Sequence, residues 1–293
     1  TSRLADYGKL ARLDVAGLEA GARVSVAGKR NITDFAVWKF SPTDTKRDME
    51  WDSPWGVGFP GWHLECSTIA RETLGDSIDI HTGGIDHIPV HHTNEIAQSE
   101  SLTGQQFSQI WLHNNHIKVD SRKMSKSLGN IITLTDITAR GFSPMAFKLA
   151  ILSKHYQTEG NFTWDILEAA QARLDHWRGY AALRHQTHDT LDDDDEKDEQ
   201  EGTVSLLAAR QALVEKLNDN LDTPGALALI DEAFSRLDHA PLEKIHRGGL
   251  LQLIEIIDEV LGLDLAESTP DINDDLKRLI IQRRSARAEK DWQ

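Results

Sequence analysis

One cysteine, one histidine and one glutamate are spaced so that they could bind a single metal ion. Cys66 lies in an apolar helical segment, and His91 and Glu95 follow it four residues apart. Side chains four apart share one face of a helix, so the imidazole and the carboxylate can converge. Zinc accepts sulfur, nitrogen and oxygen ligands, whereas a thiolate argues against magnesium or calcium. Three protein ligands leave one position open, as in a catalytic or substrate-binding zinc site.

The same residues also have a purely structural interpretation. A lone cysteine beside Leu64, Ile69 and Ala70 is common in a helix that packs against a core, and neighbouring histidines at a helix start are often exposed. Spacing alone therefore leaves a metal site and a core cysteine both open. Cys66 is the only cysteine of 293 residues, which excludes an internal disulfide and favours a cytoplasmic protein.

A short basic segment is the second candidate site. It consists of Lys123, Met124, Ser125, Lys126 and Ser127. Two lysines three residues apart, together with hydroxyl and backbone donors, could hold a triphosphate. Lysine suits this role better than arginine where the cation must follow a moving charge. A basic surface loop on an acidic protein is the alternative.

The elements that must position these residues alternate in type between residues 34 and 142. Apolar runs that predict strands lie at 35–38, 77–80 and 109–112, and helix candidates lie at 62–74 and 91–102. This alternation predicts α/β units around a parallel sheet. Gly83 and Gly84 end the second run, and the carboxyl ends of such strands are where ligands bind.

From residue 143 onward the pattern predicts helices throughout. Ser143 and Pro144 supply an N-cap and a first helical residue. Two apolar stripes predict a helical bundle, and they consist of Leu206, Leu207, Leu213 and Leu217 and of Leu250, Leu253, Ile254, Ile257, Val260 and Leu261. The acidic run at about 187–202 predicts a solvated linker between two helices. The predicted domains are therefore 1–30, 31–142 and 143–293.

Charge and hydropathy exclude two classes of protein. The net charge is −15, and nine acidic residues against one lysine lie between Asp189 and Glu201. Such a chain is a poor generic nucleic-acid binder, so any RNA contact must use a local basic face. No stretch approaches the 18 apolar residues of a membrane span, and the opening residues carry no pattern of a targeting signal. We expect no membrane partner.

Four ordered blocks resemble one family. Residues 123–127 spell KMSKS, the signature of class I aminoacyl-tRNA synthetases, and residues 60–67, 79–86 and 91–100 are similar in order and spacing to cysteinyl-tRNA synthetases. The resemblance covers nearly the whole chain and fades in the helical half. It implies an α/β fold, the second half of a Rossmann-type class I synthetase catalytic domain, followed by an all-α helical bundle that contacts tRNA. Residues 1–30 would be a remnant of the connective insertion.

The resemblance also implies an amino-acid site. Cys66, His91 and Glu95 would hold one Zn²⁺ that binds the thiolate of the substrate L-cysteine. Serine, which offers a hydroxyl in place of the thiol, would bind this zinc poorly. Trp62 would flank the cysteine side chain, and Asp86 would pair with its α-ammonium group.

An ATP site is implied in the same way. Its residues would be His81, Gly83, Gly84, Lys123, Met124, Ser125, Lys126 and Ser127, with Mg²⁺ on the phosphates. Lys123 and Lys126 would be the catalytic residues, because they would stabilise the leaving pyrophosphate as the amino-acid carboxylate attacks the α-phosphorus. The activity implied is ATP-dependent formation of cysteinyl-adenylate and transfer to tRNA(Cys) by a protein that is monomeric at full length.

The sequence departs from the family pattern in two respects. No histidine here belongs to an H-I-G-H type motif, and a fourth, cysteine zinc ligand is missing, so we expect this chain alone to be incomplete for catalysis. Ile85 and the run 87–90 also differ from the usual family residues. Two alternatives remain: the cysteine ligase of mycothiol synthesis, and a non-catalytic synthetase-derived protein that binds zinc or RNA.

Overall fold

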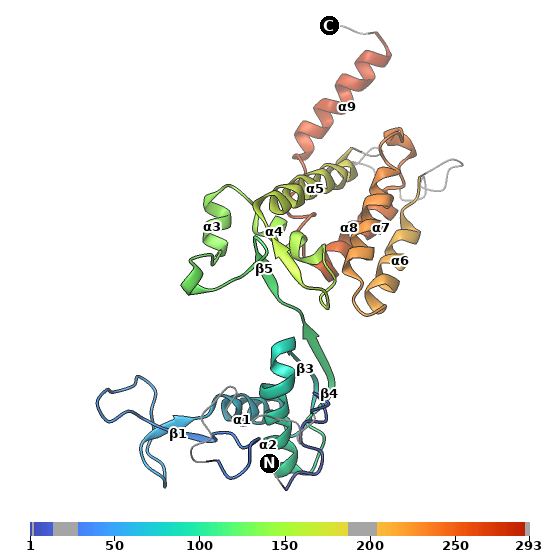
Figure 1. The fold of residues 1–293 in the computed structure, drawn as a ribbon. Coiled ribbons are helices and arrows are strands. Elements are labelled where there is room, and N and C mark those ends of the chain that lie inside the picture. Colours follow the sequence, from blue (N-terminus) through green and yellow to red (C-terminus); the bar gives the residue numbers. More distant parts are fainter. Residues whose placement is uncertain (2, 14–28, 187–203, 291–293) are drawn as a thin grey trace. The chain divides into compact units, whose positions relative to one another are not determined.

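The computed structural model describes residues 1, 3–13, 29–186 and 204–290, and packing divides the chain into two compact units, Thr1–His116 and Ile117–Gln293. Figure 1 shows the elements of both. The segment between residue 117 and the sequence-based boundary at 142 packs with the second unit, because Val119 and Ile137 are buried in its core. The acidic run at 187–202 and most of the predicted N-terminal segment lie outside the described residues.

The first unit contains strands and helices in alternation. They are β1 (Trp38–Phe40), β2 (Gly58–Pro60), α1 (Trp62–Leu74), β3 (Ile78–Gly84), the 3₁₀ turn η2 (Ile85–His87), the π-helix η3 (Ile88–His92), α2 (Thr93–Thr103) and β4 (Ser108–Asn114). Strands β1 and β2 are antiparallel, and β3 and β4 pair in parallel from Ile78 opposite Ser108 to Gly84 opposite Asn114. A small core of Ile78, Ile96 and Phe107 joins this parallel pair to α2.

Sequence patterning located most of these elements. The helix at 62–74 and the strands around 77–80 and 109–112 are confirmed. The expected strand at 35–38 instead begins at Trp38, where β2 supplies its backbone partners. The expected helix at 91–102 is α2 from residue 93, and both histidines before it lie in the π-helix η3.

The second unit contains a small sheet and most of the helices. Its elements are β5 (Ile117–Val119), β6 (Arg122–Lys123), η4 (Lys126–Leu128), α3 (Leu134–Ala139), α4 (Pro144–Leu152), β7 (Gly160–Phe162), α5 (Trp164–Ala182), η5 (Leu183–His185), α6 (Leu207–Asn218), α7 (Thr223–Ser235), η7 (Leu242–Lys244), α8 (Arg247–Leu261) and α9 (Asp274–Ala288). The N-cap at Ser143 is confirmed, because its hydroxyl accepts a hydrogen bond from the backbone N–H of Met145.

The expectation of helix throughout this half is wrong at Gly160–Phe162. These residues form β7, which pairs in parallel with β5, so the half is not all-α. Gly and Asn are both depleted in strands, so a three-residue run that begins with them gives only a weak local strand signal. These three residues form a strand because β5 supplies the backbone partners and because Phe162 is buried in the core of the unit.

Both predicted apolar stripes face the core of the helical unit, with two exceptions. Most of their leucines and isoleucines are buried, whereas Leu207 and Val260 are 42% and 41% exposed. Helices α5, α6, α7 and α8 supply most of this core. Among the described residues, no helix has the length and apolar character needed to cross a membrane.

Candidate functional site

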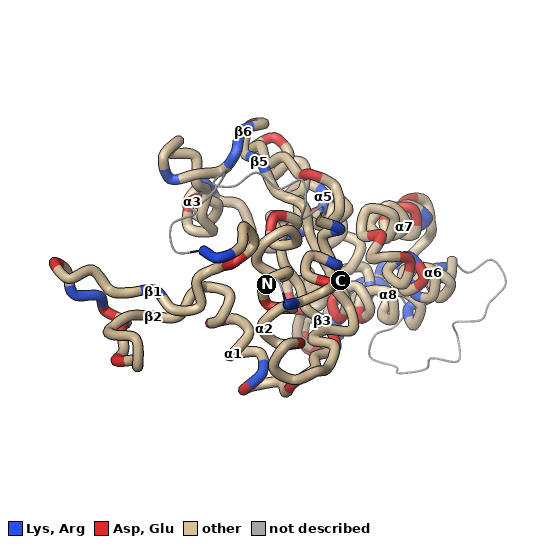
Figure 2. Tube along the Cα trace, turned by 60° about the horizontal axis from the view of Figure 1, so that its bottom comes forward, with Lys and Arg blue, Asp and Glu red and all other residues tan. Residues whose placement is uncertain are grey.

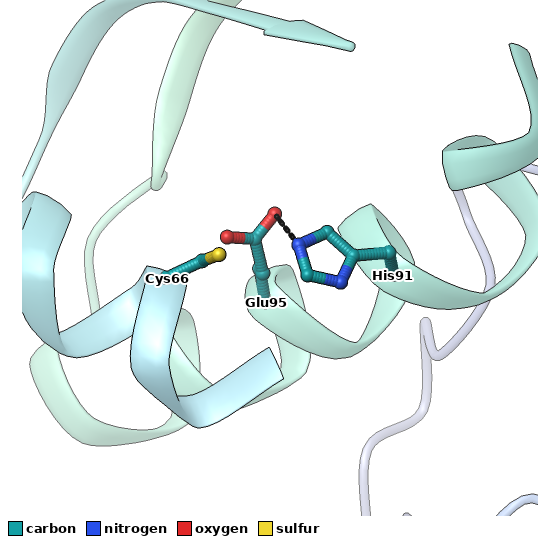
Figure 3. A group of neighbouring side chains, drawn as sticks. All are labelled: Cys66, His91 and Glu95. Carbon is teal, nitrogen blue, oxygen red and sulfur yellow. Dashed lines mark ion pairs between the residues drawn. The ribbon is translucent and has the colours of Figure 1, made fainter. Parts of the chain in front are cut away.

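Cys66, His91 and Glu95 converge in the first unit. Cys66 comes from α1, His91 from the end of η3 and Glu95 from the first turn of α2. Their ligand atoms all lie within 4.8 Å of one another. Figure 3 shows the Glu95 carboxylate between the sulfur of Cys66 and the imidazole of His91, whose Nε2 lies 3.7 Å from Glu95 Oε2.

Local contacts bring the two helices together at this point. The buried hydroxyl of Ser67, next to Cys66, donates to Gln98 Oε1 on α2 at 2.6 Å. At the start of α2, the hydroxyl of Thr93 donates to the carbonyl of Ile88 at 2.7 Å, which ties the π-helix to the helix that follows. The predicted convergence of residues 91 and 95 therefore holds across a π-to-α junction.

The Glu95 carboxylate shows that this group fits a metal ion. Its side chain is fully buried, and Oε1 has no hydrogen-bond partner among the described residues. Oε2 receives a hydrogen bond from His81 Nε2 at 2.9 Å. A buried carboxylate oxygen that lacks a partner is destabilising unless a cation or donor compensates it. The sulfur, nitrogen and oxygen donors present together are a set that zinc accepts.

The protonation states of the ligands suit metal binding. Burial, and then the negative charge of Glu95, raises the pKa of the Cys66 thiol, so the thiol is protonated at neutral pH until a metal displaces the proton. Burial lowers the pKa of His91, which keeps its imidazole neutral and able to coordinate. Cys66 is only half-buried and lies outside both hydrophobic cores, which argues against a core cysteine.

Further histidines surround the cluster, and sequence reasoning assigned no role to His63, His92 or His113. His81, His92 and Glu95 form a second group whose ligand atoms lie within 4.8 Å of one another. His63 Nδ1 lies 2.8 Å from His91 Nδ1, and His92 Nδ1 lies 2.8 Å from His113 Nε2. The available signal was concentration, because seven of the 13 histidines fall between residues 63 and 116.

Trp62 lies beside the cluster. Its ring centroid lies 4.4 Å from that of His91, and the side chain is 55% exposed, which is inconsistent with a core aromatic. Asp86 lies in the 3₁₀ turn after β3, where its exposed carboxylate faces His116 Nε2 at 4.0 Å.

The two glycines that end β3 are required by their neighbours. A Cβ atom at Gly83 would lie 2.6 Å from His92 Cε1 and 2.8 Å from His87 Nδ1, and one at Gly84 would lie 2.5 Å from Asp86 Oδ1. Only glycine fits at Gly83 without displacing two imidazole rings. The structure therefore places Gly83, Gly84 and His81 at the carboxyl end of a parallel strand.

The KMSKS segment lies in the second unit. Lys123 ends β6, which Figure 2 shows as a basic stretch, and Lys126 begins the turn η4. Asn130 closes the loop, because its Oδ1 accepts from the Ser125 N–H at 2.9 Å and its Nδ2 donates to the Lys123 carbonyl at 3.0 Å. Neither lysine forms an ion pair with a described residue. Sequence reasoning gave Asn130 no role, since its contacts depend on the loop conformation.

Tyr7 links the N-terminal segment to the helix that carries Glu95. Its hydroxyl donates to Asn94 Oδ1 at 2.7 Å, and burial, followed by the charge of Asp34, raises its pKa to about 12.

Tyr7→Phe leaves the buried Asn94 oxygen without this donor, so we expect a loss of about 1–3 kcal/mol in the free energy of unfolding by urea. Tyr156→Phe is the matched control, because that hydroxyl donates to Asn220 Oδ1 on the exposed surface. Equal losses in the two variants would contradict the expectation.

Comparison with known families identifies the fold. The sequence profile of the family described as tRNA synthetases class I (C) catalytic domain matches residues 1–172. The chain belongs to this family. The resemblance of the four sequence blocks is thereby confirmed, and the match continues past residue 142 into α5.

Several relatives of this class I (C) synthetase chain share the name cysteine–tRNA ligase. The chain is 44% identical to cysteine–tRNA ligase 1 of Burkholderia lata, with 100% of this chain and 58% of that protein covered. It is 40% identical to cysteine–tRNA ligase of Chlamydia caviae, with 98% of this chain and 60% of that protein covered. The chain is 38% identical to cysteine–tRNA ligase of Anoxybacillus flavithermus, with 100% of this chain and 63% of that protein covered. The chain thus spans about 60% of the length of these relatives.

A solved structure supports the fold assignment alone. The ternary complex of Agrobacterium radiobacter K84 agnB2 LeuRS with tRNA and LeuAMS matches at a TM-score of 0.51 and 17% identity, covering 78% of this chain and 36% of that chain. At this level of identity, the match supports a mixed α/β, class I synthetase-like fold.

Proposed function

We propose that this chain is part of a cysteine–tRNA ligase, which activates L-cysteine with ATP and transfers it to tRNA(Cys). The observation that carries the proposal is the convergence of Cys66, His91 and Glu95, whose buried carboxylate has one oxygen, Oε1, without a hydrogen-bond partner among the described residues. The names of relatives 38–44% identical to the chain support it. In this proposal the protein acts in the cytoplasm and is a monomer at full length.

Cys66, His91 and Glu95 would hold zinc in this protein. When bound, zinc supplies a soft position that a substrate thiolate completes far better than a hydroxyl does. His81 would orient the Glu95 carboxylate through the hydrogen bond to Oε2. Trp62, exposed beside His91, would flank the cysteine side chain, and the exposed Asp86 carboxylate would pair with the α-ammonium group. Discrimination against serine would then need no separate editing reaction.

ATP would bind to two sets of residues. His81, Gly83 and Gly84 would lie beside the adenosine, where the glycines let a ligand approach the backbone. The second set is the KMSKS segment, in which Lys123, Met124, Ser125, Lys126 and Ser127 would contact the phosphates together with Mg²⁺. The cysteine carboxylate attacks the α-phosphorus and pyrophosphate leaves, so no protein nucleophile takes part. The two lysines would stabilise the charge that develops on the leaving group.

Cysteine and serine distinguish this proposal from a structural metal site. Cobalt in place of zinc makes thiolate coordination visible, because a new sulfur ligand adds a charge-transfer band. We expect L-cysteine to produce such a band in the cobalt-loaded chain and L-serine to produce none, since the thiol loses its proton on binding and the hydroxyl does not. L-Alanine serves as the control for binding through the amino and carboxylate groups. Identical spectra with cysteine and serine would refute a thiol-selective site.

A further inference from the structure

The last helix of this acidic protein is strongly basic. Between Leu276 and Lys290 the sequence contains six basic residues and one acidic residue, although the whole chain has a net charge of −15. These residues belong to α9 and its C-terminal end. The positive charge is therefore concentrated in one helix. An acidic chain that binds a polyanion needs such a local basic surface.

Three arginines in the second half of α9 remain without ion pairs in the described part of the chain. Earlier in this region, Lys277 pairs with Asp271, and Arg278 pairs with Asp275 at 3.0 Å. Arg283, Arg284 and Arg287 have no such acidic neighbour among the described residues. The helix dipole accounts for a cation in the last turn, which is Arg287, but not for the pair one turn earlier.

The three arginines lie on one face of the helix. Arg283 and Arg287 are four residues apart and Arg284 and Arg287 are three apart, so their side chains are neighbours on the helix surface. All three are exposed, and no residue of α9 is buried. Their positive charges repel one another, which a bound anion would relieve. Guanidinium groups present paired N–H donors that match phosphate oxygens.

The start of α9 is tied to the bundle. The buried Arg184 in η5, the turn that follows α5, donates to the carbonyls of Ala266 and Thr269, at 2.9 and 2.8 Å, in the segment before α9. His185 Nδ1 lies 3.3 Å from Asp271 Oδ2 in the same segment. The helix that carries the three arginines therefore begins after a segment that is anchored to the rest of the unit.

We propose that Arg283, Arg284 and Arg287 bind the phosphate backbone of folded RNA. The identity of that RNA as tRNA(Cys) rests on the proposed function, whereas its polyanionic character rests on the charge of the helix. A membrane surface is disfavoured, because the apolar residues of α9 do not form a stripe along its length. The contact is to phosphates, so it contributes affinity and leaves sequence specificity to other residues.

Charge reversal tests this inference on the full 293-residue chain. The variant is R283E/R284E/R287E, and the control is K154E/R210E/R236E, which changes the same charge at exposed positions of the helical unit. Fluorescence anisotropy gives the Kd for a tRNA(Cys) transcript and for an unrelated tRNA over a series of salt concentrations. Circular dichroism checks that both variants remain folded.

We expect the α9 variant to raise the Kd for both RNAs about tenfold or more at about 50 mM salt, and to make the salt dependence shallower by roughly two to three counterions. The control should change the Kd less than about threefold, because its residues come from three separate segments and are not neighbours on one helix. Unchanged affinity in the folded α9 variant overturns the inference and leaves the proposed function standing. A loss of affinity that is equal for both RNAs, with no preference of the wild-type chain for tRNA(Cys), supports the α9 surface while contradicting the choice of tRNA. Loss of binding to phosphatidylserine vesicles, with tRNA affinity unchanged, also overturns it.

Discussion

Cys66→Ser should lower the zinc affinity of this chain by more than about 100-fold, while the melting temperature changes little. Loss of a group that only supports a metal ligand already costs 10–100-fold, and here a ligand itself is replaced by a hydroxyl of much higher pKa. The fold should persist, because Cys66 is half-buried and belongs to neither hydrophobic core. If the residue were a core cysteine, the same change would cost stability and leave zinc binding unchanged.

Competition with a chromophoric chelator measures the zinc affinity, and thermal unfolding without metal measures the stability. Thr68→Ala on the exposed side of α1 is the matched control, since it alters the same helix without altering the cluster. We expect the control to retain its zinc. Full zinc retention in a folded Cys66→Ser variant would remove Cys66 from the site, and with it the proposed discrimination between cysteine and serine.

The parts of this fold that follow local rules were predictable from sequence. Helix α1 and strands β3 and β4 follow from apolar runs separated by turn residues, and the start of α4 follows from Ser143 and Pro144. The cluster was predictable because the His91–Glu95 spacing and the resemblance to a family indicate the same residues. These features depend on residues near one another in the chain or on a pattern of ordered blocks.

The parts that were missed depend on contacts between distant residues. Strand β7 exists because β5 lies beside it, and two of its three residues, Gly160 and Asn161, are of types depleted in strands. The hydrogen bond from His81 to Glu95 joins a strand to a helix 14 residues later, so its geometry is set by how α2 packs on the β3–β4 pair. Asn130 likewise acquires its role from the turn that brings it beside Lys123 and Ser125. No periodicity records such contacts.

Lys126→Ala should lower kcat for ATP–pyrophosphate exchange by about 100-fold to 1,000-fold in the complete protein, with a much smaller rise in the KM for ATP. The loss expected is that of one preorganised group that stabilises developing charge. Lys126 is exposed at the start of η4, and Asn130 holds the preceding backbone. A cation placed in this way contacts phosphates whose charge changes as the bond to pyrophosphate breaks, so its contribution is larger in the transition state than in the ground state.

The ratio of the change in kcat to the change in the KM for ATP identifies the role of Lys126. Lys154→Ala, at an exposed lysine elsewhere in the helical unit, should leave both parameters close to wild type. Lys126→Arg keeps the charge but replaces a compact ammonium on a flexible stem with a planar fork, so it should recover only part of the lost kcat. A Lys126→Ala variant in which the KM for ATP rises and kcat is unchanged would show that the lysine binds substrate and transition state equally. The KMSKS segment would then be an ATP-binding loop whose lysine contributes affinity without catalysis.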